Sequence, residues 1–300
     1  MSSKKTNSPL LFIAWKCAAA IAAGCAVVIK PSEFASVSTL EYAALTKEAG
    51  FPDGVFNVVT GYGAEAGSAL VDHPQVAKIT FTGSDVTGAK IYAQAAQSMK
   101  RVSLELGGKN PMIVLEGANL KRAAELALAG AFGSAGQLCV SIERIYVPNH
   151  LKAAFLTELT ARTRTLAVGH SRDFRMDMGT LTGQNQLDRV AGFIDQAKSS
   201  GATVVAGGHA LPELGPYFYA PTVITEVTPA ADLYRKEVFG PVLDVEGYDT
   251  VDEAINLAND TEYGLNASVV GPKRAALKVA SQLMAGSVNI NEGFRATFAS

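Results

Sequence analysis

The chain has 300 residues, 48% of them apolar, which is enough for about two folded domains with a buried core and argues against disorder. Charged residues make up only 18%, and 26 lysines and arginines nearly balance 28 aspartates and glutamates. This balance argues against nucleic acid and an anionic membrane as partners. The cysteines at positions 17, 25 and 139 are too few for a disulfide framework. Cys139 is therefore a candidate nucleophile.

The apolar stretch over residues 10–29 has two interpretations. The first is a secretory signal with a lipoprotein-type cleavage site before Cys25. The second is a helix over residues 9–23, a stop at Gly24 and a buried strand over residues 26–29. Lys16 weakens the first interpretation, because a charge at the centre of a membrane-inserting helix costs ~2.5 to 3.5 kcal/mol. We expect the second, and with it a cytoplasmic protein.

Strands and helices alternate through the first hundred residues. Besides the segments above, the pattern predicts helices at 38–49, 64–71 and 84–96 and strands at 55–59, 78–81 and 101–106. Such alternation indicates a parallel sheet covered by helices. Ligands of these sheets bind beyond the carboxyl ends of the strands, where Lys30, Gly61, Gly83 and Glu105 are expected to converge.

A second region of the same α/β type begins near residue 107. Its predicted strands are 112–115, 144–147, 203–206 and 287–291, and its predicted helices are 120–132, 151–167, 186–200, 251–258 and 273–284. Repeats, charge blocks and low-complexity linkers are absent from the sequence. The chain is thus predicted to form two interlocked α/β lobes.

Two glycine clusters have both a functional and an ordinary explanation. Residues 61–67 and 83–88 place glycines where backbone could approach a phosphate at a helix start, but a plain strand-to-helix turn explains either cluster equally well. Lys30 and Glu33 add a cation and a carboxylate at a strand end. They could hold a ribose, although on local sequence alone a solvated loop is the commoner explanation.

Cys139 and two carboxylates are the candidates for chemistry. Cys139 lies between a predicted helix and a strand, where it is either a nucleophile or a small buried hydrophobe. Glu105 stands in an apolar strand, which is costly unless the group is paired or its pKa rises, and which suits a general base. Glu237 is flanked by apolar residues in the same way. The four histidines show no metal-ligand spacing, so we expect no metal and no Cys/His dyad.

Taken together, these segments resemble the aldehyde dehydrogenase superfamily. The resemblance covers the whole chain, in the family's order, through residues 7–10, 30–33, 81–84, 104–109, 136–139, 237–242 and 259–265. Residues 108–114, 141–147 and 288–293 look most like NAD(P)-dependent succinate-semialdehyde dehydrogenases. The sequence looks truncated at both ends relative to that family.

The resemblance implies a Rossmann-type parallel-sheet cofactor domain and an α/β catalytic domain. Residues 1–107 would form a partial NAD(P)-binding domain, and residues 108–300 a catalytic domain with an incomplete carboxyl end. The implied reaction is the oxidation of an aldehyde, of which succinate semialdehyde is one candidate, to the acid. The family would also imply a homo-oligomer, which is doubtful for so short a chain.

Site roles follow from the resemblance residue by residue. Cys139 would attack the aldehyde, Asn7 and the Cys139 N–H would hold the oxyanion, and Glu105 would activate water. The implied cofactor residues are Lys30, Ser32 and Glu33 at the adenosine ribose, Gly83 and Ser84 at the pyrophosphate, Leu106, Glu237 at the nicotinamide ribose, and Phe239 beside the nicotinamide ring. Because the Glu33 carboxylate would repel a ribose 2′-phosphate, NAD is favoured over NADP.

Three departures from the family pattern keep other functions open. Asn7 lacks the usual preceding Pro-Trp, Ser134 replaces an asparagine, and the cysteine loop lacks the arginine that would anchor a substrate carboxylate, for which Arg295 is a possible substitute. One alternative is an inactive nucleotide-binding fragment. The other is a cofactor-independent thioester or ester hydrolase that needs only Cys139 and Glu105.

Overall fold

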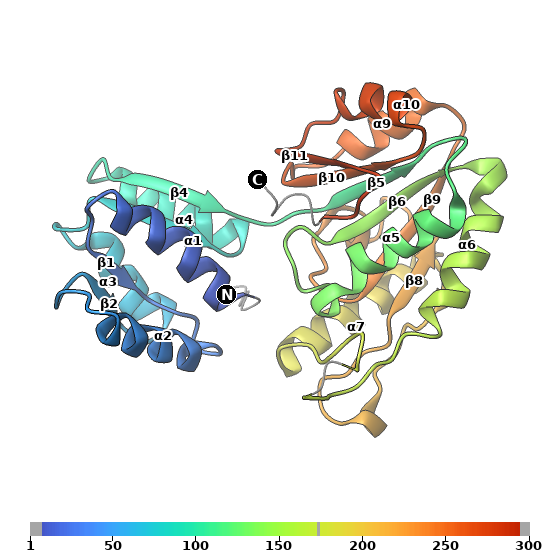
Figure 1. The fold of residues 1–300 in the computed structure, drawn as a ribbon. Helices are drawn as coiled ribbons and strands as arrows, with labels where there is room; N and C mark the ends of the chain where they lie inside the picture. The colour runs from blue at the N-terminus through green and yellow to red at the C-terminus, as the bar shows by residue number, and fades with distance from the viewer. Residues whose placement is uncertain (1–7, 173–174, 295–300) are drawn as a thin grey trace. The chain divides into compact units, whose positions relative to one another are not determined.

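The computed structural model describes residues 8–172 and 175–294 of the chain. The chain divides into two compact units, residues 1–106 and residues 107–300. Strands and helices alternate in both units (Figure 1). Among the described residues, no helix is both long enough and apolar enough to cross a membrane.

The first unit begins with a helix, a glycine with positive φ (Gly24, φ +80°) and a short strand, as the second interpretation of residues 10–29 predicts. Most predicted elements are present with boundaries shifted by a few residues, but the helix expected at 64–71 starts as a π-helical turn. The elements are α1 (Pro9–Ala22), β1 (Val27–Ile29), α2 (Ser36–Glu48), β2 (Phe56–Val58), the π turn η1 (Gly63–Gly67), α3 (Ser68–Asp72), β3 (Lys78–Thr82), α4 (Asp85–Ala96) and β4 (Arg101–Glu105).

The strands of this unit pair in parallel, as their alternation with helices predicts. Strand β1 lies beside β2, and β3 lies beside β4 with Thr82 opposite Glu105. Among the described residues these are two separate two-stranded sheets rather than the single sheet of a Rossmann-type domain. A two-stranded sheet has marginal stability by itself. The stability of this unit should therefore depend more on helix packing than on the hydrogen bonds between its strands.

The second unit is built on one seven-stranded sheet in the order β11-β10-β5-β6-β9-β8-β7, parallel except for the β7–β8 pair. Strands β8, β9 and β10 and the short helix α8 were not predicted from the sequence. The elements are β5 (Asn110–Val114), α5 (Leu120–Phe132), the 3₁₀ turn η2 (Gly133–Gly136), β6 (Ile142–Pro148), α6 (Asn149–Thr163), α7 (Gln184–Ser199), β7 (Thr203–Ala206), the 3₁₀ turn η3 (Pro212–Leu214), β8 (Thr222–Thr225), α8 (Asp232–Arg235), β9 (Val242–Tyr248), α9 (Val251–Asn259), β10 (Asn266–Val270), α10 (Lys273–Ala280) and β11 (Ser287–Ile290).

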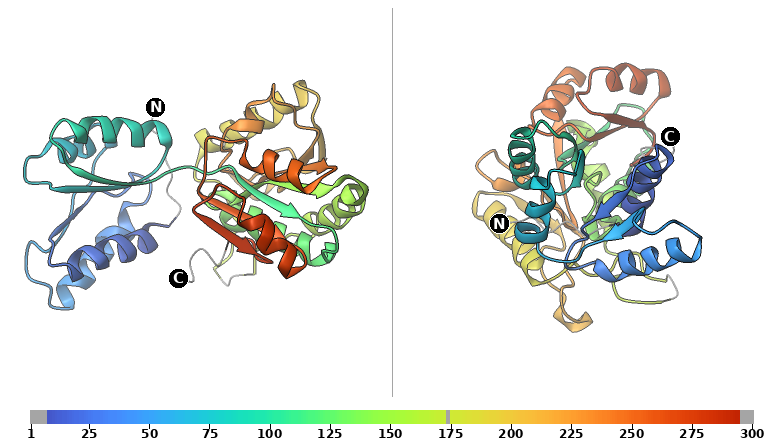
Figure 2. Two further views of the ribbon diagram at one scale, coloured as in Figure 1. Left: turned by 90° about the horizontal axis from the view of Figure 1, so that it is seen from above. Right: turned by 90° about the vertical axis from the view of Figure 1, so that its left-hand side faces the viewer.

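Both faces of this sheet are covered by helices. Successive side chains of β5 point to opposite faces, so Met112 and Val114 pack with α5, α6 and α7, while Ile113 packs with α9 and α10. Figures 1 and 2 show α5 and α6 on one side of the sheet and α9 and α10 on the other. Burial on both faces explains why β5, β6 and β10 are fully buried along their length.

Candidate active site

Three loops of the second unit meet at the amino-terminal edge of its sheet. Residues 107–109 precede β5, residues 137–141 precede β6, and residues 237–241 precede β9. Because β5, β6 and β9 are neighbouring parallel strands, their amino ends lie side by side. The carboxyl-end rule that guided the sequence analysis therefore does not hold in this unit, where the candidate residues lie at the opposite edge.

Glycines allow these loops to approach one another closely. A Cβ on Gly136, whose φ is +67°, would lie 2.0 Å from the Gly240 carbonyl oxygen. A Cβ on Gly108 would lie 2.4 Å from the Cys139 carbonyl oxygen. Backbone atoms cannot yield by such amounts, so the convergence of the loops requires glycine at both positions.

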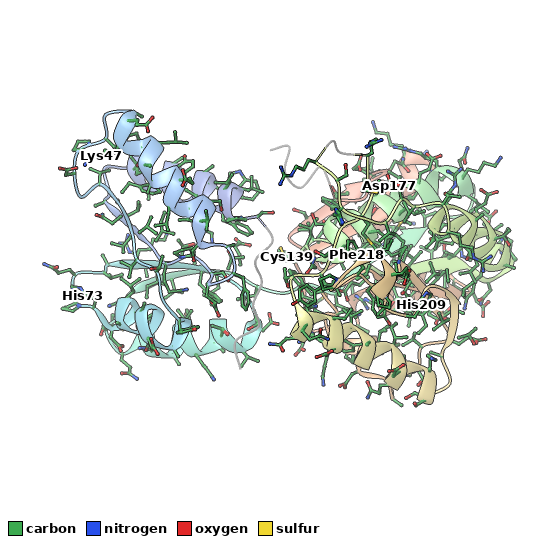
Figure 3. All side chains as sticks on the ribbon, turned by 90° about the horizontal axis from the view of Figure 1, so that it is seen from below. Lys47, His73, Cys139, Asp177, His209 and Phe218 are labelled. Atoms are coloured by element: carbon green, nitrogen blue, oxygen red, sulfur yellow. The ribbon has the colours of Figure 1, made fainter. Side chains whose placement is uncertain are left out.

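Cys139 lies in the middle one of these loops, after the η2 turn, and is half-buried. Cys17 is buried and Cys25 is exposed. Figure 3 shows Cys139 well apart from His209 of the same unit. Partial exposure suits a reactive thiol better than an inert one, which would be packed on all sides.

A buried ion pair holds the loop before β9. The Lys109 ammonium donates to Glu143 at 2.7 Å, with only 1% and 3% of the two side chains exposed. The Glu143 carboxylate also accepts the backbone N–H groups of Val238 and Phe239, each at 3.0 Å. Phe239 has a φ of +56°, a left-handed conformation that is unusual for a bulky residue. The Glu143 contacts thus fix a strained segment.

Glu237 and Phe239, both predicted to bind cofactor, are buried in this segment. The Glu237 carboxylate accepts the Gly108 N–H at 3.2 Å, and the Glu237 carbonyl accepts a hydrogen bond from Arg189 at 2.7 Å. Gln186 donates to the carbonyls of Val238 and Phe239. Glu237 is therefore linked directly to the glycine turn before β5.

The remaining predicted cofactor residues lie in the first unit at carboxyl ends of strands. The Lys30 ammonium follows β1 and donates to the carbonyls of Pro31 (2.5 Å) and Gly61 (3.2 Å), so it joins the loops after β1 and β2. The Ser32 hydroxyl accepts the Phe34 N–H at 3.3 Å, and Glu33 is exposed. The loop after β1 thus carries a cation fixed by two carbonyls and, three residues later, an exposed carboxylate.

Gly83 and Ser84 lie where β3 passes into α4. The Ser84 side chain caps the helix by accepting the Thr87 N–H at 3.4 Å. A Cβ on Gly83 would lie 2.3 Å from the Phe81 ring, and one on Gly88 would lie 2.5 Å from the Leu106 side chain. The turn thus combines glycines packed closely against the Phe81 and Leu106 side chains with the N-terminus of a 12-residue helix, and such a helix start suits a phosphate.

Glu105 corrects one expectation. The sequence places this carboxylate inside an apolar strand, where burial would raise its pKa, but in the structure it ends β4 and is exposed. The burial argument for a general base is therefore wrong, and its role rests on the family resemblance. Asn7 and Arg295 lie outside the described residues. In the described part of the chain, no group of three or more histidine, cysteine or acidic side chains could hold a metal.

Some residues that organise the site were not predicted. The 141–147 stretch was expected to contain a strand and a family motif, but Glu143 and Arg144, near the start of a fully buried strand, were not predicted to take part in the site. Arg144 donates to the carbonyls of Lys109, Leu257 and Ala258 at 2.9 to 3.1 Å. Two charges in succession at the head of an apolar run are a signal that could have indicated buried, partnered groups.

The comparisons with known proteins agree on one family. The family model described as "Aldehyde dehydrogenase family" matches residues 7–299. A peroxisomal aminoaldehyde dehydrogenase of Pisum sativum is 44% identical over 287 residues, which are 95% of this chain and 57% of that protein. A putative succinate-semialdehyde dehydrogenase [NADP(+)] of Mycolicibacterium smegmatis is 45% identical over 94% of this chain and 54% of its own length.

Solved structures are equally similar. An NAD-dependent aldehyde dehydrogenase from Sinorhizobium meliloti superposes with a TM-score of 0.92 at 41% identity, over 95% of this chain and 57% of that one. A betaine aldehyde dehydrogenase from Staphylococcus aureus in complex with NAD+ gives a TM-score of 0.92 at 39% identity, over 95% and 58%. The chain spans about half the length of the curated relatives it matches.

Proposed function

Because the chain belongs to the aldehyde dehydrogenase family, we propose that it carries out, or contributes to, the NAD(P)-dependent oxidation of an aldehyde to the carboxylic acid. In this proposal residues 1–107 form a partial NAD(P)-binding domain and residues 108–300 the catalytic domain. The observation that carries it is the meeting of a half-buried Cys139 loop with the Glu237–Phe239 segment at one edge of the second unit's sheet.

The proposed chemistry uses one nucleophile and one base. The Cys139 thiolate adds to the aldehyde carbon, and the Asn7 amide with the Cys139 N–H holds the resulting oxyanion. Bound NAD(P)+ would supply a two-electron acceptor for hydride from this carbon. The Cys139 thioester that remains is cleaved by a water molecule that gives one proton to Glu105, and this cleavage releases the acid and restores the Cys139 thiolate.

The residues present fit such a cofactor. In the first unit, Lys30, Ser32 and Glu33 would hold the adenosine ribose, Gly83 and Ser84 the pyrophosphate, and Leu106 would pack nearby. In the second unit, Glu237 would hold the nicotinamide ribose and Phe239 would pack beside the ring. The exposed Glu33 carboxylate favours NAD, because it would repel the extra phosphate of NADP.

The substrate class that we propose is a short aldehyde such as succinate semialdehyde, as for the Mycolicibacterium smegmatis relative. Succinate semialdehyde carries a carboxylate, whereas aminoaldehydes and betaine aldehyde carry a cation, so a panel containing both distinguishes the two groups of relatives. We further propose a cytoplasmic protein.

Nicotinamide reduction with this aldehyde panel tests the proposal. We expect Cys139→Ala to abolish reduction and Cys25→Ala, at an exposed cysteine, to leave the rate unchanged. Equal rates in wild type and Cys139→Ala would remove the nucleophile. Absence of activity in the wild-type chain, together with retained NAD binding in a titration, would indicate a nucleotide-binding fragment instead.

A further inference from the structure

In the cysteine loop, residues 137–141 before β6, three consecutive backbone carbonyls accept hydrogen bonds from side-chain amides. Asn110 Nδ2 donates to the carbonyls of Cys139 (2.8 Å) and Ser141 (2.7 Å). Asn266 Nδ2 donates to the carbonyl of Val140 between them at 3.1 Å. Every peptide carbonyl from Cys139 to Ser141 is thus held from the interior of the second unit.

The amides are joined to one another. Asn110 Oδ1 accepts the backbone N–H of Asn266 at 3.1 Å, and Asn266 Oδ1 accepts a hydrogen bond from Asn289 Nδ2 at 2.7 Å. Asn289 also donates to the Ala267 carbonyl at 3.2 Å. With its oxygen taken by Asn289, the Asn266 amide must turn its NH₂ group toward Val140, so the network itself fixes the orientation.

The three asparagines come from three different strands and are buried. Asn110 begins β5, Asn266 begins β10 and Asn289 lies in β11, with 1% to 3% of each residue exposed. Asparagine is a poor strand former, and three of them inside a parallel sheet need a reason beyond local propensity. Their reason here is a fully connected polar network, which is rigid because a lost partner leaves a buried polar atom unsatisfied.

We propose that Asn110, Asn266 and Asn289 are positioning residues, which hold the Cys139 backbone in the conformation from which its thiol reacts. This inference rests on the proposed role of Cys139. A Cβ on Gly108 would lie 2.4 Å from the Cys139 carbonyl oxygen and 2.9 Å from Asn110 Nδ2, so the hydrogen bond between these two atoms requires glycine at position 108. A plain structural role for the asparagines would change stability but not the reactivity of the thiol.

The test is the rate at which iodoacetamide alkylates Cys139, followed by peptide mass spectrometry across a pH series. Alkylation needs neither cofactor nor aldehyde, so it reports on the loop alone. The variants are Asn110→Asp and Asn266→Asp, which keep the acceptor oxygen and remove the donor to the loop. Thr225→Val is the matched control, because it removes a buried hydrogen bond of 2.7 Å to the Val245 carbonyl elsewhere in the same sheet.

We expect about a tenfold or larger change in the Cys139 alkylation rate, with a displaced pH profile, in both asparagine variants. Thr225→Val should lower the melting temperature and leave alkylation unchanged. Asn289→Asp acts one step further away and should shift the profile in the same direction but less, which keeps the test open if a variant of Asn110 or Asn266 fails to fold. Unchanged alkylation in folded asparagine variants would overturn the inference.

The two proposals fail separately. If alkylation responds to the asparagines while wild type oxidises no aldehyde, the positioning role stands and the proposed function falls. If wild type oxidises aldehydes through Cys139 but the asparagine variants leave both kcat and alkylation unchanged, the positioning role alone is refuted.

Discussion

The two units of this chain bury their apolar side chains very differently. In the second unit two apolar clusters fill both faces of a seven-stranded sheet. In the first unit, the buried apolar side chains among the described residues are Ile13, Cys17, Val71 and Ala95. Its exposed large apolar side chains are Leu10, Leu11, Trp15, Val28, Phe34, Val37, Leu40, Leu45, Phe51, Val59, Tyr62, Val86, Tyr92 and Met99.

This difference shows that α/β alternation alone does not make a core. Both units alternate strands with helices (Figure 2), yet only in the second do the strands join into one wide sheet that helices can cover on both faces. Apolar burial contributes roughly 25 cal/mol per Å², so most of the stability of the chain should reside in residues 107–300. Four experiments with substituted variants break or sharpen this contrast.

The largest effect is expected at the buried ion pair of the second unit. Glu143→Ala leaves the Lys109 ammonium and two backbone N–H groups without their acceptor, which should cost about 3 to 5 kcal/mol in the free energy of unfolding measured with urea. Lys236→Ala removes an exposed pair with Asp232 and should cost no more than about 1 kcal/mol. Equal costs would show that the buried ion pair contributes no more to the free energy of unfolding than the exposed one.

A matched pair of apolar truncations compares the units directly. Ile145 is 0% exposed in β6, and Ile145→Ala should cost about 2 to 5 kcal/mol by opening a cavity. Leu45 in α2 is 59% exposed, and Leu45→Ala should change the unfolding free energy by no more than about 0.5 kcal/mol. A large cost at Leu45 would mean that its side chain is covered in solution.

Asp244 provides a test through pH. Burial, with the Glu246 carboxylate adding to it, raises the pKa of Asp244 well above its usual range. A carboxyl group whose folded pKa exceeds its unfolded pKa stabilises the fold at low pH, and this contribution is lost as pH rises through the folded pKa. Asp244→Asn stays neutral, so its unfolding free energy should improve relative to wild type as pH rises from about 4, the pKa of an unfolded aspartate, through the raised pKa of the folded Asp244. A difference that is flat with pH would show that Asp244 is ionised in the fold.

The smallest effects are expected at helix caps. Thr250 caps α9 in the second unit with a complete capping box, and Ser84 caps α4 in the first. Thr250→Ala and Ser84→Ala should each cost about 1 kcal/mol locally. Hydrogen exchange along α4 and α9 measures this, and a loss of protection spreading through β1 to β4 in Ser84→Ala would reveal how little else supports the first unit.

Local patterns predicted the parts of the fold that depend on local chemistry. The helix–glycine–strand start, the Gly83–Ser84 turn and the apolar run of β6 all follow from periodicity and turn residues. The comparisons confirm the family and the α/β fold that the motifs indicated. Strand β9 was not predicted because Asp244, Glu246 and Gly247 interrupt its apolar pattern. Asp244 is buried and the other two are half-buried, which makes sense only beside neighbours that are distant in sequence.

In the candidate site, too, local sequence predicted some features, whereas others depend on residues distant in sequence. Its motifs pointed to Cys139 and Glu237, but their partners lie far away in the sequence: Asn110 for the cysteine loop and Gly108 for the Glu237 carboxylate. Glu105 looked buried because its neighbours in sequence are apolar, whereas exposure depends on what packs against the strand end. The hydrogen-bond partners and the exposure of a side chain depend on the assembled sheet, so they cannot be predicted from one segment of sequence.

The left-handed backbone of Phe239 affects the stability of this protein and its proposed cofactor binding in opposite ways. A bulky residue in that conformation costs free energy that glycine would not incur, and the Glu143 carboxylate holds it there by accepting its N–H. Phe239→Gly would ease the backbone while deleting the ring proposed to flank the nicotinamide. Selection for stability would therefore favour glycine at position 239, whereas selection for the proposed activity would favour phenylalanine.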